Sequence, residues 1–514
     1  MSTTLISELA TPDANVSVIL PELIVAAAGV IVMLYDSFFP KQRIVSGVIA
    51  LAGIVISGII LATMWGGDVP ASSWGGMIAH DNLRLSFSFV FLFVSAMTIL
   101  ISTVWVERED VPVGEYHALL LFATFGMMMM SAGNDLVVIF LGLETLSIAT
   151  YVMAGLRKGD LRSNESAMKY FILGSFASAF LLYGMALVYG ATGETNLTLI
   201  ATKMAAPNFP ALLLVGAAMM IIGFGFKIAM APFHVWTPDV YEGAPTPITG
   251  FMAAGPKAAA FASFIRVFVI GLPLVAGVQV SGYLHNSWIT ALSLLAILTM
   301  IIGNVAAIMQ SSVKRMLAYS SIAHAGYALV GFVGAGLAKT PEARDAAIAS
   351  VAFYMLTYAV TNLGAFAVIT LLAQKNDRRT EFEDYNGIGF KAPVLAFSLS
   401  LFMLSLLGLP LTAGFIGKVL VFRPALESGN TLVTIVVVAA VINTAISAYY
   451  YLRLIVVMFF RERTSDWAAP KMPAAMTAAL VIAILGVFYL GIFGDRLIER
   501  FSIAPATTVV RAEK

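Results

Sequence analysis

The chain has 514 residues, of which 60% are hydrophobic and only 11% are charged, and its mean hydropathy is +0.90. A soluble protein lacks the polar surface to cover such a composition, so a membrane protein is indicated. The formal net charge of +1 provides no field that would attract a nucleic acid, and the lack of cysteine excludes disulfides, thiolate metal sites and iron–sulfur ligation on this chain.

Apolar stretches long enough to cross about 30 Å of hydrocarbon follow one another along the sequence. They predict an all-α polytopic membrane protein of about 14 transmembrane helices. In chain order the predicted spans are 18–38, 45–66, 85–106, 116–132, 135–156, 167–191, 210–230, 246–271, 287–308, 315–336, 347–373, 393–409, 430–459 and 472–494. The segment before the first span has no Lys or Arg, unlike a cleaved signal peptide, so we expect that span to remain as an anchor.

The orientation follows from the Lys and Arg residues of the loops, because basic loops are retained on the cytoplasmic side. Before the C-terminal tail, one set of alternate loops holds only Lys203, Lys339 and Arg344. The other set holds Lys41, Arg43, Arg108, Arg157, Lys158, Arg162, Lys169, Lys314, Arg315, Lys375, Arg378, Arg379, Lys391, Arg461, Arg463 and Lys471. We therefore expect both termini to face the outside.

Charged residues inside predicted spans are functional candidates, because each costs at least about 2.5–3.5 kcal/mol at the bilayer centre. Glu144 lies midway along the fifth span, Lys227 near the end of the seventh and Lys257 in the middle of the eighth. Lys418 follows the twelfth span. Other basic residues of the spans are Arg84, Arg266, Arg423 and Arg453, and we expect structural roles for Arg84, Arg423 and Arg453, which lie near span ends or can reach the interface.

Two of these lysines lie beside prolines that should open a helix. Pro232 follows Lys227 by five residues, and Pro410 precedes Lys418 by eight. The seventh and twelfth helices would thus be broken with opposite polarity, as in an inverted-topology repeat. We expect N-terminal helices 1–3 (1–112), a first repeat of helices 4–8 (113–272), a second of helices 9–13 (285–460), and helix 14 with a tail (461–514).

These charges favour a proton path over a substrate pocket. Burial disfavours the charged form of a lysine and a nearby carboxylate favours it, so making and breaking a Glu144–Lys227 pair would switch the lysine between holding and releasing a proton. His234 and His324 are relay candidates. The alternatives are that Lys227 pairs with Glu144 only to specify packing, and that His324 is a packing residue. We expect neither a metal nor a nucleotide site.

Four long stretches resemble one family of membrane proteins. They are GLETLSIATYVMAG (142–155), NESAMKYFILGSFASAFLLYG (164–184), GFGFKIAMAPFHVWTPDVYEGAPTPITGFMAAGPKAAAFASFIR (223–266) and SVKRMLAYSSIAHAGY (312–327). They are similar to the antiporter-like membrane subunits of respiratory complex I. The run HVWTPDVYEGAPTPITGF favours subunit N of proton-translocating NADH-quinone oxidoreductase over its relatives L and M and the Mrp-type antiporter subunits.

The resemblance carries expectations about function. The family's proton-translocating residues fall on Glu144, Lys227, Lys257 and Lys418, and the last is a glutamate in subunit M. The resemblance implies a bacterial inner (plasma) membrane protein with periplasmic termini, with neighbouring antiporter-like and small membrane subunits of complex I as partners. No cofactor or redox centre would lie on this chain, because other subunits oxidise NADH and reduce quinone. The alternative is a Mrp-type or stand-alone cation/proton antiporter subunit.

Overall fold

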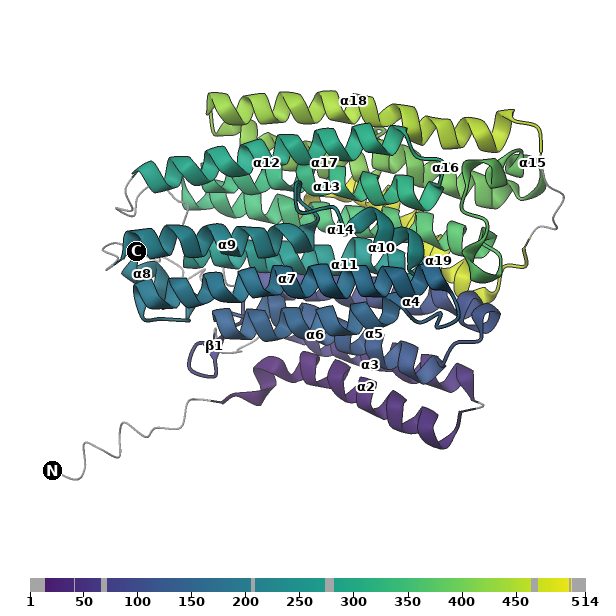
Figure 1. The fold of residues 1–514 in the computed structure, drawn as a ribbon, viewed down its shortest axis with the longest axis horizontal. Coiled ribbons are helices and arrows are strands. Elements are labelled where there is room, and N and C mark those ends of the chain that lie inside the picture. Colours follow the sequence, from purple (N-terminus) through teal and green to yellow (C-terminus); the bar gives the residue numbers. More distant parts are fainter. Residues whose placement is uncertain are drawn as a thin grey trace, which may run out of the picture.

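The computed structural model describes residues 14–40, 42–65, 72–204, 209–272, 282–463, 470–498 and 501. Lys41 and the tail beyond residue 501 lie outside these ranges. Long helices lie side by side and run along one common direction (Figure 1). In the described ranges 13 helices are long and apolar enough to cross a membrane, which confirms the prediction of a polytopic all-α protein.

Every predicted span coincides with a helix. These helices are α2 (Leu20–Phe38), α3 (Arg43–Thr63), α4 (Asn82–Glu109), α5 (Val113–Ala132), α6 (Leu136–Ala154), α7 (Leu161–Thr192), α9 (Pro210–Ile228), α11 (Thr246–Ile265), α12 (Gly282–Ile308), α13 (Val313–Gly336), α14 (Pro341–Leu372), α16 (Pro393–Leu407), α18 (Thr431–Phe460) and α19 (Ala474–Phe493). The twelfth span, α16, has 15 residues and is too short to cross the membrane unaided.

Shorter elements connect the spans. The helical ones are η1 (Val16–Ile19), α8 (Leu197–Lys203), α10 (Thr237–Gly243), η2 (Arg266–Gly271), η3 (Lys375–Asp377), η4 (Phe382–Tyr385), α15 (Ile388–Lys391), α17 (Ala413–Glu427) and α20 (Asp495–Ile498). The strands β1 (Ser72–Ser73) and β2 (Ile78–Ala79) pair antiparallel, with Ser72 opposite Ala79. These connections are too small to form a separate soluble domain.

Short polar side chains set where several helices begin. Asp135 caps α6 and Asp160 caps α7, each accepting a hydrogen bond from the backbone N–H two residues on. Ser312 caps α13 by accepting from the N–H of Arg315, and Asn430 caps α18 by accepting from the N–H groups of Leu432 and Val433. Each cap satisfies a backbone donor of the first helical turn, which has no partner within its own helix. The helix ends are therefore fixed by residues of the loops.

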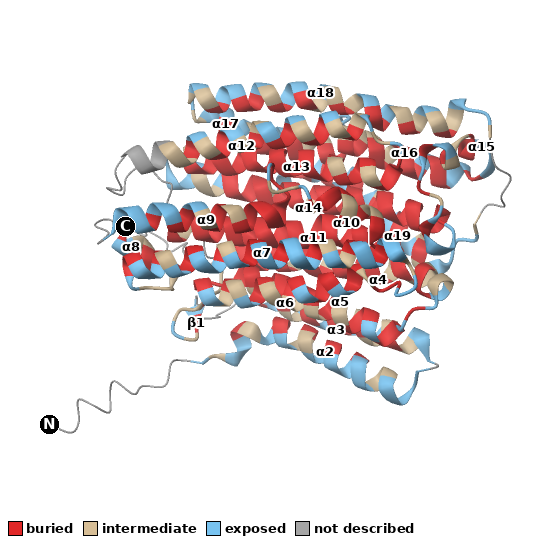
Figure 2. Ribbon diagram, in the orientation of Figure 1, coloured by how far each residue is buried: buried red, intermediate tan, exposed pale blue. Residues whose placement is uncertain are grey.

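Three helices form the centre of the bundle. In α11 with η2, in α13 and in α14, 94% of the most apolar window is buried, against 33% in α3, α7 and α18 (Figure 2). A helix that is apolar on all faces and covered on all faces belongs to a protein core, whereas the others leave one side for lipid or another chain. Nearly all side chains in the apolar parts of α11, α13 and α14 therefore contact other parts of the protein.

Two spans are broken, as the prolines predict. The helix α9 ends at Ala229, which has a left-handed backbone (φ 60°), and an irregular segment leads to the short α10. The helix α16 ends at Gly408 (φ 96°), and the chain becomes helical again in α17. Lys227 precedes its break, whereas Lys418 follows its break. Opposite orders of this kind are expected of two halves that form an inverted repeat.

Three arginines of the predicted spans have partners within the protein. Arg84 forms a fully buried ion pair with Glu22, with Nη2 and Oε1 2.7 Å apart, and joins α4 to α2. Arg266 pairs with Asp81 at 2.7 Å. Arg453 lies over the ring of Phe382, with Cζ 4.2 Å from the ring centroid. The structure therefore supports packing roles for these residues.

At one end of the bundle, Asp377 joins loops that are far apart in the sequence. Its carboxylate is contacted by Arg108 at 3.2 Å, Arg157 at 3.3 Å and Lys314 at 3.6 Å, and it accepts a hydrogen bond from the backbone N–H of Thr246 at 3.0 Å. The loops that the sequence assigns to one basic side thus meet at a single buried carboxylate. Burial raises the pKa of Asp377, but Lys314, Arg157 and Arg108 outweigh it and hold the pKa below the ordinary value.

We expect Asp377→Asn to destabilise the protein by about 3–5 kcal/mol, because the fully buried Lys314 loses its described ion-pair partner and Arg108 and Arg157 each keep only one of two. Thermal unfolding of the purified complex measures this loss. Since the folded pKa is lowered, the stabilisation by Asp377 is present above about pH 3.9 and disappears as the pH falls through the folded pKa. Glu427→Gln, which removes an exposed pair with Arg423, is the control and should cost at most about 1 kcal/mol. Equal effects of the two substitutions would contradict a bridging role for Asp377.

Candidate functional site

Lys227 lies at the first break, one residue before the end of α9. Only 6% of its surface is exposed, and its Nζ has no hydrogen-bond partner among the described residues. Two tyrosine rings surround the amine, with Nζ 5.2 Å from the centroid of Tyr151 and 5.3 Å from that of Tyr170. Aromatic faces stabilise an ammonium group without neutralising it. The amine is therefore buried, yet not committed to any acceptor.

Glu144 does not form an ion pair with Lys227 in this structure. It lies on α6, half-buried, and its carboxylate accepts a hydrogen bond of 2.5 Å from the hydroxyl of Ser178 on α7. Tyr151 lies seven residues further along α6, on the same helical face, and its hydroxyl packs against Gly174, one turn before Ser178. The predicted carboxylate–lysine pair is thus open, with Tyr151 placed beside the lysine.

Lys257 lies in the middle of α11, directly after Pro256, and is 1% exposed. Its Nζ donates to the carbonyl of Ser321 on α13 at 2.5 Å and also contacts the Ser321 hydroxyl. The ring of Tyr358 on α14 lies 5.8 Å from Nζ. Its hydrogen bonds and its ring contact are with neutral groups, so this lysine belongs to a polar contact at the centre of the bundle.

His324 lies one turn along α13 from Ser321 and is 4% exposed. Its Nδ1 is 2.6 Å from the hydroxyl of Tyr354, and its Nε2 is 3.1 Å from the hydroxyl of Tyr451. Tyr451 in turn shares a hydrogen bond of 2.5 Å with Ser320. A histidine with a hydroxyl at each ring nitrogen can accept a proton on one side and release one on the other.

Lys418 lies in α17 and is 5% exposed. Its Nζ donates to the carbonyls of Leu406 at 3.0 Å and Leu407 at 2.9 Å, which end α16. These carbonyls have no helical partner because the helix stops at Gly408. The ring of Tyr327 on α13 lies 4.8 Å from Nζ. The break in the helix therefore creates the binding site of the amine.

The side chains around Lys257, His324 and Lys418 form one connected region. Ser321, His324 and Tyr327 are spaced three residues apart on α13, a rise of about 9 Å from first to last. The ring of Tyr358 contacts both Lys257 and His324, and Tyr354 packs against Gly417 beside Lys418. Within the described ranges no carboxylate forms an ion pair with Lys257 or Lys418. The structure thus brings Lys257, His324 and Lys418 together around α13.

Lys227 is connected to this region through aromatic rings. Tyr170 stacks on Trp236 at 4.5 Å between centroids, and Trp236 meets Tyr241 of α10 at 5.9 Å. The helix α10 packs on α13. His234 lies in the break between α9 and α10, half-buried, and its Nδ1 has no partner among the described residues. No described contact joins His234 to Lys227, so the structure does not bring this relay candidate to the lysine.

Sequence reasoning allowed tyrosines as possible relays but did not identify which neutral residues surround the charges. Ser178, Ser321, Tyr151, Tyr327 and Tyr354 are ordinary residues of apolar helices when they are considered singly. A usable signal exists in the spacing, since Tyr151 follows Glu144 by seven residues and Ser321 and Tyr327 flank His324 by three.

The chain was compared with known proteins. Residues 133–488 match the family described as "NADH:quinone oxidoreductase/Mrp antiporter, TM". A relative from Trichlorobacter lovleyi, NADH-quinone oxidoreductase subunit N, is 44% identical over 490 residues, with 94% of this chain and 96% of the relative covered.

Solved structures agree with this result. A chain of the respiratory complex I of Thermus thermophilus with bound aureothin is 33% identical, with a TM-score of 0.77 and with 94% of this chain and 100% of that chain covered. A chain of the Mrp complex of Dietzia is 18% identical, with a TM-score of 0.76 and coverage of 95% and 96%. The Mrp comparison establishes a shared fold, whereas the complex I comparison also extends to the sequence.

Proposed function

Because the chain belongs to the family of NADH:quinone oxidoreductase/Mrp antiporter membrane subunits, we propose that it is subunit N of a proton-translocating NADH-quinone oxidoreductase. It moves protons across the membrane while other subunits oxidise NADH and reduce quinone, and it carries no redox centre itself. Its partners are the neighbouring membrane subunits, and its location is the inner membrane of a bacterium, with both termini periplasmic. The basic loops around Asp377 then face the cytoplasm.

One observation carries the proposal. Lys227, Lys257 and Lys418 are all buried, and none forms an ion pair within the described ranges. A lysine kept only for packing needs a counter-charge, because an unpaired buried charge is strongly destabilising. A buried amine without a counter-charge can instead lose its proton, because burial disfavours its charged form and no carboxylate compensates. The arrangement therefore favours proton transfer over a packing role.

The geometry supports a sequence of proton movements. Glu144 acts as the switch, since its half-buried carboxylate is bound to Ser178 and not to Lys227 in this structure. Movement of the carboxylate toward Lys227 stabilises the charged lysine, and its return to Ser178 releases a proton. Lys257 and His324 carry the proton across α13, and Lys418 passes it to the outside. Protons enter from the cytoplasmic side near Lys227 or Lys257.

Half-burial of Glu144 has a consequence for assembly. The same face of α6 exposes Val137, Leu141, Ile148 and Val152. A carboxylate on an apolar face of a membrane helix needs a polar partner, because lipid provides none. We therefore place a neighbouring membrane subunit of the complex against this face, where its charges influence Glu144. Such an arrangement links the state of one subunit to the proton affinity of Lys227 in the next.

The alternative is a Mrp-type cation/proton antiporter, which shares the fold at 18% identity, against 33% for the complex I chain. Reconstitution of the purified complex in vesicles distinguishes the two functions. We expect acidification of the vesicle interior on addition of NADH and quinone, in sodium-free buffer. Proton exchange that is driven by a sodium gradient, with no response to NADH, would instead establish the antiporter. Lys257→Met should retain assembly on native gels and lose NADH-driven acidification.

A further inference from the structure

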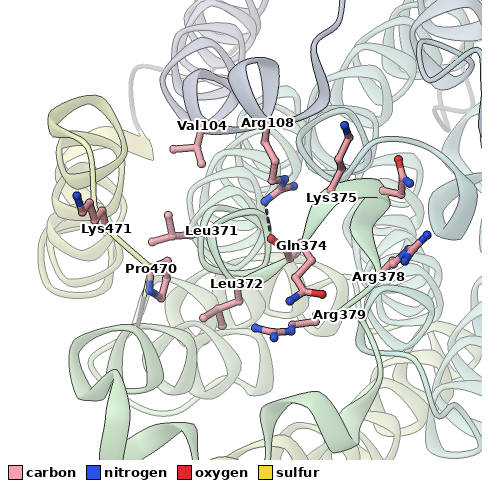
Figure 3. Close-up of a pocket in the computed structure, with 12 residues that line it drawn as sticks. Val104, Arg108, Leu371, Leu372, Gln374, Lys375, Arg378, Arg379, Pro470 and Lys471 are labelled. Carbon is pink, nitrogen blue, oxygen red and sulfur yellow. Dashed lines mark hydrogen bonds between the residues drawn. The ribbon is translucent and has the colours of Figure 1, made fainter. Parts of the chain in front are cut away.

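At the Asp377 end of the bundle, a pocket of about 650 Å³ lies between the end of α4, the end of α14 and the residues that precede α19 (Figure 3). Such a volume is typical of sites for small molecules. The cations that line it are Arg108, Lys375, Arg378, Arg379 and Lys471, and no Asp or Glu is among the described lining residues. It is separate from the proton path.

Three of these cations form no ion pair or hydrogen bond with the part of the chain that the structure describes. Arg108 is bound to Asp377 and Glu109, and Arg379 contacts the amide of Gln374. By contrast, Lys375, Arg378 and Lys471 are exposed and form no ion pair or hydrogen bond within the described ranges. Figure 3 shows Lys471 on the opposite side of the pocket from Arg378 and Arg379. Positive charge therefore surrounds the pocket on two sides, and no carboxylate is among the described residues that line it.

The pocket also has an apolar part, and its position decides the class of ligand. The helices α4 and α14 end at Glu109 and Leu372, so the cations lie at the level where the spans leave the membrane. Val104, Leu371 and Leu372 line the pocket as well, and Val104 lies about 7.5 Å below the end of α4. In a phospholipid the phosphate lies at the membrane border and the acyl chains lie beneath it. The cations and the apolar residues of the pocket are placed at these same two levels, so they can bind the phosphate and the acyl chains respectively.

We propose that this pocket binds the headgroup of an acidic phospholipid, with its phosphate between Arg378 and Lys471 and its acyl chains against Val104. A free phosphate shares the anionic chemistry, but it gains nothing from the apolar lining. Binding in the pocket would hold the end of α4, the loop after α14 and the start of α19 together. Such a lipid stabilises the same end of the bundle as Asp377.

The test uses a photoreactive benzoylphenylalanine at position 104 in the intact complex, in vesicles of phosphatidylcholine with one part in ten phosphatidylglycerol. Mass spectrometry identifies the cross-linked lipid. We expect phosphatidylglycerol to be enriched in the adduct over its share of the vesicle. Arg378→Gln with Lys471→Gln should reduce the ratio of phosphatidylglycerol to phosphatidylcholine in the adduct by up to about 25-fold, since each cation near the surface contributes about fivefold to binding of an anionic lipid. The side chains are exposed and unpaired, so folding should be unaffected.

The control is Lys158→Gln with Arg162→Gln, which removes two exposed cations from another loop on the same side and should leave the adduct unchanged. Equal loss in the control, or no loss in the pocket variant, overturns the proposal. Two further samples receive either inorganic phosphate or chloride, at equal ionic strength, before cross-linking. If phosphate displaces the lipid and chloride does not, the pocket binds a free anion and the lipid assignment is wrong. An adduct with another subunit instead of lipid also overturns it.

Discussion

Lys227→Met is expected to reduce NADH-driven proton uptake by about tenfold or more while leaving the assembly of the complex intact. The amine has no hydrogen-bond partner in the described parts of the chain, so its removal leaves no described group unsatisfied. The unbranched methionine fills nearly the same volume between the rings of Tyr151 and Tyr170. Stability should therefore stay the same or rise. Loss of activity without loss of stability is the result that a proton carrier predicts and a packing residue does not.

Lys227→Arg provides the matched control for charge. A guanidinium stays protonated at any physiological pH and cannot release its proton, so this variant should also fail to pump although the positive charge is retained. Lys339→Met, at an exposed site, controls for the loss of a lysine in general. Proton uptake is measured in reconstituted vesicles, and assembly is measured on native gels. Full uptake by an assembled Lys227→Met complex would remove Lys227 from the path.

The sequence predicts the spans well because a membrane imposes a simple rule on them. Any segment that crosses hydrocarbon must be about 20 residues long, apolar and helical. The prolines and glycines around Lys227 and Lys418 also predict the two breaks, since Pro232 and Pro410 cannot continue a helix. The twelfth span shows the limit of this rule. Its second part, α17, lies beyond the predicted end at residue 409, because Lys418 and the glycines lower the apolar signal there.

The contacts between helices are not contained in these rules. Nothing in the spacing of α6 indicates that Glu144 binds Ser178 in preference to Lys227, since the choice depends on how α7 packs between α6 and α9. The convergence of Arg108, Arg157 and Lys314 on Asp377 is equally invisible, because these residues are far apart in the chain. In the sequence, Asp377 is one of several charges in a polar loop. Its burial is a property of the assembled bundle alone.

The two breaks give the lysines different surroundings, and this difference separates their roles. Lys227 faces aromatic rings and has no acceptor among the residues that the structure describes, so its charged form depends on a carboxylate that can approach and withdraw. Lys418 is bound by two carbonyls that the break sets free, so its charged form is already stabilised by the backbone. A proton is therefore released readily at Lys227 and held more firmly at Lys418, which suits a donor and a terminal acceptor along one path.

Substitution of Lys418 should separate hydrogen bonding from proton transfer. Lys418→Gln keeps N–H donors for the carbonyls of Leu406 and Leu407 but cannot titrate, so we expect an assembled complex with proton uptake reduced by about tenfold or more. Lys418→Glu restores an ionisable group and should retain part of the uptake, whereas Lys418→Ala leaves both carbonyls without a donor and should also lower stability by about 1–3 kcal/mol. NADH-driven uptake in vesicles and thermal unfolding of the same preparations measure the two effects. If Lys418→Gln pumps at the full rate, the amine serves only to close the broken helix. If Lys418→Glu is as inactive as Lys418→Gln, proton transfer at this position needs an amine, and the expectation that a carboxylate can replace it is wrong.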